Sequence, residues 1–494
     1  MVNGIDSEGF YNAFEDVTKF TFTKEGHERS KTVSSIFAEG DSRSTMLQQR
    51  YYTILQQIFR DSKFIDTARG KRGADFPVIS FGGDSGSPNE SETSNSSSLL
   101  VIHAAHKETD ETPDTKVAPV PQWRFEVTPV ESLPGSTGIK VVFGMLSRGM
   151  DGKLVIEDIH QAVVVKIDSV AASDDFITEN TFILAKGSMI DEVFHIYEMT
   201  LPPVPIRSLC EGAVNTSGGP GDLTEEVLTH TLGDPPQDAT IAIVSNINLE
   251  DPMTLEKLSA LLTGFEEADS VPSAFVFMGD FISKKFNPFS GDSLRAFQKG
   301  FDALSQILSK HPKTLENAKV VIVPGANNDP GQGALPQPPF ADSLVRGISS
   351  RFPNVVLGTN PCRIRFYNKN LVFFNGNVSA SLRKTRIIGN GLTDDGEDFA
   401  KFARCIFSQL HLIPGPVRDE AIIWDHDQGL RLYPPPHALI YGDPDLKAGQ
   451  INTVGGETLL IAPPCFSDAR RTFDFHLYTP HSNESMLSEV SESA

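Results

Sequence analysis

The spacing of apolar residues changes from helical to strand-like along the first half of the chain. Within 41–59, apolar residues recur every three or four positions with Gln and Arg between them. This pattern predicts a helix that docks one apolar face on a neighbour. From 138 to 203 the apolar residues fall instead in short alternating runs, at 139–146, 154–157, 162–167, 182–185 and 193–197. Several short strands at this pitch predict a small all-β domain.

The length of this all-β stretch fits a five-stranded oligonucleotide/oligosaccharide-binding (OB) barrel. A Met150-Asp151-Gly152 turn joins the first two runs, as expected for consecutive antiparallel strands. Strand counting alone does not separate such a barrel from a sandwich, so both architectures remain open at this point.

The second half of the chain alternates strands and helices. Strands are predicted at 240–244, 274–278, 320–323, 364–367, 371–374, 459–462 and 473–477. Between the first three strands, Leu and Phe recur at helical spacing. Asp251 and Pro252 supply an N-cap and a first helical residue for the earlier of the two helices. The carboxyl half is therefore predicted to be an α/β domain.

Composition divides the chain into six segments. Ser, Asn, Glu, Asp and Thr dominate 81–118, which buries too little apolar surface to offset the entropy of ordering. Gly, Pro and Thr mark a linker before the α/β domain, and Ser and Glu predominate after His481. The predicted segments are an N-terminal extension with the docking helix (1–80), a disordered acidic Ser-rich insertion (81–118), an OB domain (119–210), a linker (211–238), an α/β domain (239–480) and a flexible tail (481–494).

Charge and cysteine content restrict the function. The chain has 64 acidic and 43 basic residues, a formal charge of -21 that repels a phosphate backbone and disfavours autonomous, tight DNA binding. Four cysteines stand singly with no CxxC pair, which favours small buried residues over metal ligands. The apolar runs fall short of the ~20 residues of a spanning helix, and no secretory signal begins the sequence. An intracellular protein is expected.

Three loops follow the first strands of the predicted α/β domain, where such a sheet places its chemistry. They read Ser245-Asn246-Ile247-Asn248, Gly279-Asp280-Phe281 and Gly325-Ala326-Asn327-Asn328-Asp329. Their order and spacing resemble the calcineurin-like phosphoesterases, whose corresponding loops carry Asp-x-His, Gly-Asp and Gly-Asn-His-Asp. The resemblance implies a β-sandwich with flanking helices.

The metal ligands of that family are not matched. Asn246 and Asn248 stand where Asp and His would bind metal, and Asn328 stands in place of the third loop's His. The nearest counterpart of the family's final Gly-His-x-His is 442–445, which has no histidine. Two metal ions about 3.5–4 Å apart need charged ligands that neutral amides do not replace. We interpret this domain as a degenerate phosphoesterase without catalytic residues, metal or cofactor, whose vestigial site positions are Asn246, Asn248, Asp280, Asn327, Asn328 and His411.

A barrel followed by a degenerate phosphoesterase domain resembles the B subunits of the eukaryotic replicative DNA polymerases, and among them those of DNA polymerase epsilon. The stretches that carry the resemblance are Leu335-Pro-Gln-Pro-Pro-Phe340 and Thr359-Asn-Pro-Cys-Arg-Ile364, with 49–57, 143–146, 154–158 and 431–434. The resemblance implies a nuclear, non-catalytic accessory subunit that binds the cysteine-rich C-terminal domain of the catalytic subunit. It also implies support of holoenzyme stability and chromosomal DNA replication. Contact with DNA is expected to be weak and confined to the complex, with no membrane contact.

One feature departs from the epsilon B subunits. They begin with a small helical domain, whereas block 49–57 comes too early here to leave room for one. This departure puts in doubt the carry-over of a contact with the GINS part of the replicative helicase, which remains an open partner.

Two other functions remain as alternatives. A diverged, active metallophosphoesterase or nuclease would use Asp280, Asp329 and His411. Asp280 and His411 also fit structural roles, as a loop cap and a hydrogen-bonded core histidine. A single-stranded nucleic-acid binder would need stacking aromatics and a basic groove. The barrel stretch is not basic, and its few aromatic residues are Phe143, Phe176, Phe182, Phe194 and Tyr197.

Overall fold

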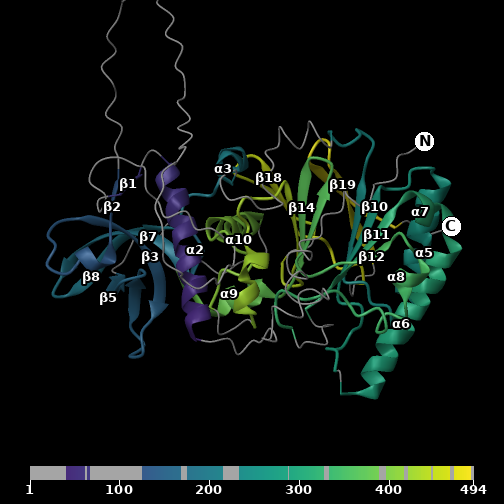
Figure 1. Ribbon diagram of the computed structural model, residues 1–494, viewed down its shortest axis with the longest axis horizontal. Coiled ribbons are helices and arrows are strands. Elements are labelled where there is room, and N and C mark those ends of the chain that lie inside the picture. Colours follow the sequence, from purple (N-terminus) through teal and green to yellow (C-terminus); the bar gives the residue numbers. More distant parts are fainter. Residues whose placement is uncertain are drawn as a thin grey trace, which may run out of the picture.

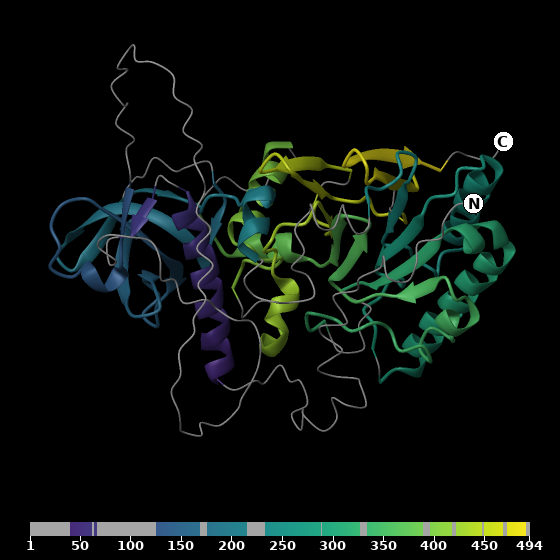
Figure 2. The same ribbon diagram turned by 45° about the horizontal axis from the view of Figure 1, so that its top comes forward.

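The computed structural model describes residues 40–61, 64–66, 125–167, 175–214, 233–287, 289–326, 333–388, 396–416, 421–446, 449–467 and 472–490. The predicted insertion 81–118 and most of the N-terminal extension lie outside these residues, as do Asn327 and Asn328. Figures 1 and 2 show a β-barrel at one end of the molecule, a larger α/β unit at the other, and one helix between them.

Five strands of the first unit close into a ring. Its strands are β3 (Lys140–Arg148), β4 (Leu154–Glu157), β5 (Ala162–Ile167), β7 (Thr181–Ile190) and β8 (Val193–Thr200). In ring order, β3 pairs with β4, β4 with β5, β5 with β8, β8 with β7, and β7 again with β3. Only the β5–β8 pair is parallel within the ring. This order is that of a five-stranded Greek-key OB barrel, so the barrel prediction is confirmed over the sandwich.

Short elements extend the barrel. β1 (Phe64–Asp66) and β2 (Phe125–Thr128) add parallel strands beside β3, and the 3-10 turn η3 (Val130–Ser132) follows them. β6 (Ile177–Thr178) pairs with β15 (Arg386–Ile388) of the α/β unit. Gln409 adds a second link, because its side chain accepts from the Phe182 N–H at 2.7 Å and donates to the Phe182 carbonyl at 2.9 Å. The barrel is thus joined to the α/β unit by backbone and side-chain hydrogen bonds.

The α/β unit contains two mixed sheets packed face to face. The six-stranded sheet has the order β12 (Val355–Leu357), β11 (Lys319–Pro324), β10 (Ala274–Gly279), β9 (Ile241–Ser245), β19 (Asp474–Thr479), β20 (Glu484–Glu489). The five-stranded sheet has the order β13 (Cys362–Phe366), β14 (Lys369–Asn375), β16 (Ala438–Gly442), β18 (Thr458–Ile461), β17 (Ile451–Val454). One core cluster joins Val276 of β10 to Phe373 of β14 and Ile440 of β16. This cluster fills the space between the sheets.

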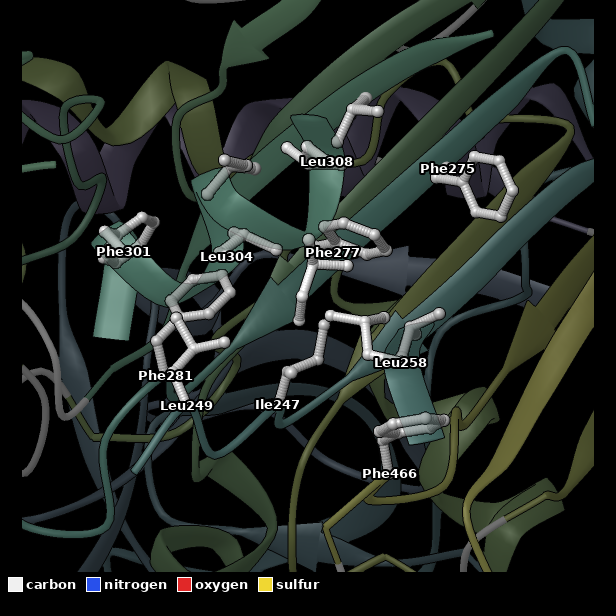
Figure 3. Close-up of a cluster of buried hydrophobic side chains, with 14 of the residues drawn as sticks. Ile247, Leu249, Leu258, Phe275, Phe277, Phe281, Phe301, Leu304, Leu308 and Phe466 are labelled. Atoms are coloured by element: carbon white, nitrogen blue, oxygen red, sulfur yellow. The ribbon is translucent and has the colours of Figure 1, made fainter. Parts of the chain in front are cut away.

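Helices cover both outer faces of this sandwich. On the six-stranded sheet they are α5 (Pro252–Glu267), α6 (Gly291–Lys310), α7 (Pro312–Asn317) and α8 (Ile348–Arg351). Figure 3 shows part of their core, which groups Phe277 of β10 with Leu258 of α5 and Leu304 of α6. On the five-stranded sheet, α9 (Val378–Lys384) and α10 (Gly396–Ser408) contribute Leu382 and Phe402 to another core. These layers are the β-sandwich with flanking helices that the sequence predicted.

Local sequence explains where the helices begin. Asp251 caps α5, because its carboxylate accepts from the Met253 N–H at 3.1 Å and Pro252 follows it. Ser290 caps α6 in the same way. The predicted docking helix is α2 (Gly40–Arg60). Its Tyr51 and Ile54 share a core with Phe143 and Phe182 of the barrel. Figures 1 and 2 both place α2 between the barrel and α10.

Two segment predictions need correction. The predicted flexible tail (481–494) contains β20, which pairs with β19 over six residue pairs because Asn483 (φ +54°) turns the chain back. Its Ser and Glu residues are typical of a disordered tail, but the pairing with β19 makes the segment a strand. The predicted linker (211–238) begins inside α3 (Arg207–Val214), whose Ser208 Oγ donates to Glu457 at 2.7 Å.

Candidate functional site

Loops that follow four strands meet at one edge of the sandwich. After β9, the Asn246 N–H donates to the Met278 carbonyl at 2.8 Å, and Asn246 Oδ1 accepts from the Asp280 N–H at 3.2 Å. After β14, the Gly376 N–H donates to the Gly442 carbonyl of β16 at 2.9 Å. The structure therefore brings Asn246 and Asp280 together, as expected for side chains at the carboxyl ends of neighbouring strands.

Glycines allow the backbone to approach these side chains closely. Gly279 has φ +91°, and a Cβ there would lie 2.6 Å from Asn375 Nδ2 and closer still to Asn246 Oδ1. A Cβ on Gly442 would lie 2.9 Å from the same Asn375 Nδ2. Since real Cβ atoms do not approach so near, both positions require glycine while Asn375 keeps its place.

Four side-chain amides lie at this edge, and we call Asn246, Asn360, Asn375 and Gln337 the amide cluster, of which all but the partly buried Asn246 are buried. Asn360 Nδ2 donates to the Asn375 carbonyl at 2.6 Å and to Gln337 Oε1 at 2.9 Å. The Asn375 N–H donates to Asn360 Oδ1 at 3.0 Å. Asn375 Oδ1 in turn accepts from the Ala326 N–H at 3.4 Å, which links β14 to the loop after β11. Side-chain amides thus connect the loops of both sheets.

Asn360, Asn375 and Gln337 were not among the predicted site residues. Asn375 ends β14, so the rule that selected Asn246 and Asp280 applies to it equally. The signal was present in Asn375-Gly376-Asn377, directly after an apolar run.

Asn248 has local partners. Its Oδ1 accepts from the Glu250 N–H at 3.1 Å, and its N–H donates to Ser467 Oγ at 2.8 Å. Asn248 therefore forms a turn within the β9–α5 loop.

Asp443, in the counterpart of the family's final histidine motif, also has local partners. Its carboxylate accepts from the N–H and the hydroxyl of Ser379, at 2.8 and 2.9 Å. Burial raises the pKa of Asp443 despite these donors. This carboxylate therefore joins the loop after β16 to the start of α9.

His411 lies in a different cluster from Asn246 and Asp280. Its Nε2 is 2.9 Å from Arg50 Nη2 of α2 and 3.1 Å from Asp427 Oδ1 of the 3-10 helix η4 (Trp424–Leu430). Its Nδ1 is 2.9 Å from the Ile413 carbonyl. The Ile413 N–H also lies 2.9 Å from Nδ1, so the backbone of Ile413 can pair with either tautomer of the ring. With Arg431, whose Nε donates to Asp427 at 3.0 Å, these residues form what we call the charged cluster.

The charged cluster is buried between α2 and the α/β unit. Burial and then the charge of Arg50 lower the pKa of His411 to about 4. Burial would by itself raise the pKa of Asp427, but Arg50, His411 and Arg431 hold it well below its usual range. His411 is therefore neutral and Asp427 is ionised, and the Asp427 carboxylate binds both Arg50 and Arg431. These contacts indicate a structural role in fixing α2.

Stability is expected to fall as the pH drops from about 6.5 to 4. Burial lowers the pKa of His476 to about 4 as well, so the unfolded chain binds protons in this window that the folded chain does not. Each histidine contributes on the order of 3 kcal/mol that is present above pH 6.5 and lost toward pH 4. Urea unfolding at stepped pH measures the decline. The variant His476→Gln lacks one of the two histidines, so its free energy of unfolding should fall less between pH 6.5 and 4. A loss of stability confined to pH below 4 would contradict the lowered pKa of these histidines.

The barrel offers few aromatic side chains for stacking on bases. Phe143, Phe176, Phe182 and Phe194 are buried, whereas Tyr197 is 39 % exposed. The β7–β8 turn, which in OB folds can contact oligonucleotides, carries Asp191 and Glu192. The surface of the barrel therefore does not favour single-stranded nucleic acid.

Other candidate chemistry is limited within the described residues. No group of three or more His, Cys, Asp or Glu side chains there is placed to hold a metal ion. None of the helices in that part of the chain combines the length and apolar character that crossing a bilayer requires. The structure places no disulfide between the four cysteines, all of which lie in the described part of the chain. Burial raises the pKa of Cys362 and Cys405 to about 12, as expected for small buried residues.

Comparison with known proteins gives the family. Residues 241–448 match the model of the DNA polymerase alpha/epsilon B subunit, and residues 98–203 match the OB-fold domain model described as DNA polymerase epsilon subunit 2-like. The DNA polymerase epsilon B subunit of Arabidopsis thaliana is 32 % identical over 373 residues, which cover 74 % of this chain and 69 % of that protein. DNA polymerase epsilon subunit 2 of Mus musculus is 30 % identical, with 73 % and 67 % covered.

Solved structures include a more distant neighbour. An archaeal phosphodiesterase aligns with 51 % of this chain and 99 % of its own length, at 11 % identity and a TM-score of 0.26. The sequence relatives are decisive, because two are at least 30 % identical and the chain covers at least two thirds of each. The chain therefore belongs to the family of DNA polymerase epsilon B subunits.

Proposed function

We propose that this chain is a non-catalytic accessory subunit of the DNA polymerase epsilon complex, which binds the C-terminal domain of the catalytic subunit and stabilises the holoenzyme. The observation that carries the non-catalytic part is Asn246. A dinuclear centre needs anionic ligands that offset two cations, and an amide supplies no charge. Asn246 Oδ1 is already occupied by the Asp280 N–H at 3.2 Å. The amide therefore closes the loop by hydrogen bonding where a metal ligand would stand.

Rigidity supports the proposed scaffold role. The barrel, α2 and the sandwich are joined by the charged cluster, by the Gln409–Phe182 bonds and by the β6–β15 pair. A partner that contacts several of these parts meets a preformed surface and loses little entropy in ordering it. A rigid subunit of this kind is suited to the assembly of a multisubunit enzyme.

The complex, rather than this chain alone, is proposed to contact DNA. A formal charge of -21 opposes a phosphate backbone over most of the surface. The chain would then act in the nucleus, in chromosomal replication and associated repair, through the catalytic subunit it holds.

A metal and activity assay tests the non-catalytic part. The full chain, purified without chelators, should hold far less than one transition-metal ion per molecule and should not cleave a phosphodiester with added Mn²⁺. Asp280→Asn should behave identically. Two bound metals together with cleavage that Asp280→Asn abolishes would establish the alternative, an active metallophosphoesterase or nuclease.

Depletion in the native cell tests the accessory part. Removing this chain should shorten the lifetime of the epsilon catalytic subunit and stall replication, because an unassembled subunit exposes interface surface and is degraded. Re-expression of the chain with Asp280→Asn should restore both. An unchanged level of the catalytic subunit after depletion would reject the proposed stabilising role.

A further inference from the structure

The outer strands of the two sheets, β17 and β20, lie side by side. Asn483 Nδ2, in the turn before β20, donates to the Glu457 carbonyl after β17 at 3.1 Å. At the other end, a Cβ on Gly449, just before β17, would lie 3.1 Å from Leu487 of β20. Within the described residues, each of these strands pairs on one side only. Two strand edges therefore run along the same side of the sandwich.

Exposed apolar side chains gather along these edges. Met486 is 60 % exposed and Leu487 is 47 % exposed, and as neighbours in a strand they point to opposite faces of the sheet. Ile451 of β17 is also exposed. Ile206, just before α3, and Leu209 of α3 are exposed at the Glu457 end, where Ser208 of α3 donates to the Glu457 carboxylate. We call this set the edge strip: Ile206, Leu209, Ile451, Met486 and Leu487.

Within the residues that the structure describes, the edge of β20 lacks the usual protection against strand addition. Natural edge strands carry Lys, Pro or a bulge, or are covered by another segment. The sequence Glu-Ser-Met-Leu-Ser-Glu of β20 has no Lys or Pro, and its pairing with β19 is unbroken from Glu484 to Glu489. Exposed carboxylates stand only at its two ends. The strand is thus a regular template with an apolar middle and acidic ends.

We propose that an extended segment of the catalytic polymerase subunit adds to the outer edge of β20 and packs its apolar side chains on the edge strip. The proposal rests on the proposed function, since it names where that partner is held. Backbone hydrogen bonds to β20 would supply affinity, and alternate side chains would supply specificity. Glu484 and Glu489 predict Lys or Arg near both ends of the added segment.

The edge strip fits this occupant better than other exposed apolar residues do. A stable subunit interface buries at least about 1,000 Å² around an apolar centre. The edge strip holds five of the twelve large hydrophobic side chains that are exposed among the described residues. Two of the five, Met486 and Leu487, belong to β20 itself, whose outer backbone N–H and C=O groups suit a partner in an extended conformation.

A titration with the full-length catalytic subunit tests the proposal. Met486→Lys removes an apolar anchor and repels a basic segment, and the exposed position leaves folding intact. The dissociation constant should rise at least about tenfold. Met150→Lys, the same change at a fully exposed turn of the barrel, is the matched control and should stay within about twofold. Hydrogen exchange should show that the amides of 484–489 that point away from β19 become protected when the catalytic subunit is added.

The outcomes separate this proposal from the proposed function. If the wild-type chain does not bind the catalytic subunit, the proposed function itself fails. If it binds, and Met486→Lys binds as well as Met150→Lys, the docking site is overturned while the accessory role stands. If the amides of 484–489 that point away from β19 are already protected in the isolated chain, the edge belongs to another part of this chain or to a second copy, and the proposal is also overturned.

Discussion

Replacing Asp427 with alanine is expected to lower the free energy of unfolding by about 3–5 kcal/mol. The Asp427 side chain is 1 % exposed and Arg50 is 7 % exposed, so removal of the carboxylate leaves buried guanidinium groups without a counter-charge. Arg431 loses the same partner, at 3.0 Å. Because Arg50 belongs to α2, the helix should separate from the α/β unit before the sandwich itself unfolds.

Tryptophan fluorescence during urea unfolding measures this separation. Trp424 lies in η4, with the Arg43 guanidinium of α2 6.0 Å from its ring centroid. In a Trp123→Phe background it is the sole tryptophan, since the chain has two. Asp292→Ala, which breaks an exposed pair with Arg295, is the control and should change stability by less than about 0.5 kcal/mol. A similar effect of both substitutions would refute the role assigned to the charged cluster.

Replacing Gly279 with alanine should cost at least about 2 kcal/mol and loosen the loops of the amide cluster. The residue has φ +91°, which strains any side-chain-bearing residue. Its new Cβ would also lie 2.6 Å from Asn375 Nδ2 and nearer to Asn246 Oδ1. Either the Asn246 or the Asn375 side chain, or the backbone at Gly279, must move to make room. We expect this movement to break the hydrogen bond from the Asp280 N–H to Asn246 Oδ1.

Gly264→Ala is the matched control for this substitution. Gly264 is exposed in α5, and nothing lies within 4 Å of the added Cβ. Stability should rise by about 0.5–1 kcal/mol, since alanine favours a helix over glycine. Thermal unfolding of both variants gives the comparison, and hydrogen exchange at Asp280 locates the damage. If Gly279→Ala melts at the same temperature as Gly264→Ala, the backbone at Gly279 does not require glycine.

Local sequence was sufficient for much of the fold. β9, β10 and β11 are continuous apolar runs, typical of strands buried on both faces, and they lie within two residues of the predicted bounds. The start of α5 is fixed by Asp251 and Pro252, which a sequence shows directly. β20 was missed because its exposed edge is rich in Ser and Glu, and only its pairing with β19 makes it a strand.

The site was harder to predict than the strands around it. Asn246 and Asp280 follow two neighbouring parallel strands, β9 and β10, so topology alone placed them together. Asn375 ends a strand of the other sheet, which its sequence indicates, but no local pattern shows that the packing of the two sheets brings it to Asn246. His411 was grouped with them as the counterpart of a later single histidine of the phosphoesterase family, and a lone histidine has no spacing to test. Its partner Arg50 lies 361 residues away, beyond the reach of any motif.

Co-purification with the epsilon catalytic subunit tests the central claim most directly. This chain would be co-expressed with the full-length catalytic subunit and, in parallel, with one that lacks its C-terminal domain. Native mass and bound metal would be measured on each product. The account predicts a one-to-one complex only when the C-terminal domain is present, with no stoichiometric metal on this chain when it is isolated. The absence of a complex with the full-length subunit, or the same complex without its C-terminal domain, would contradict it.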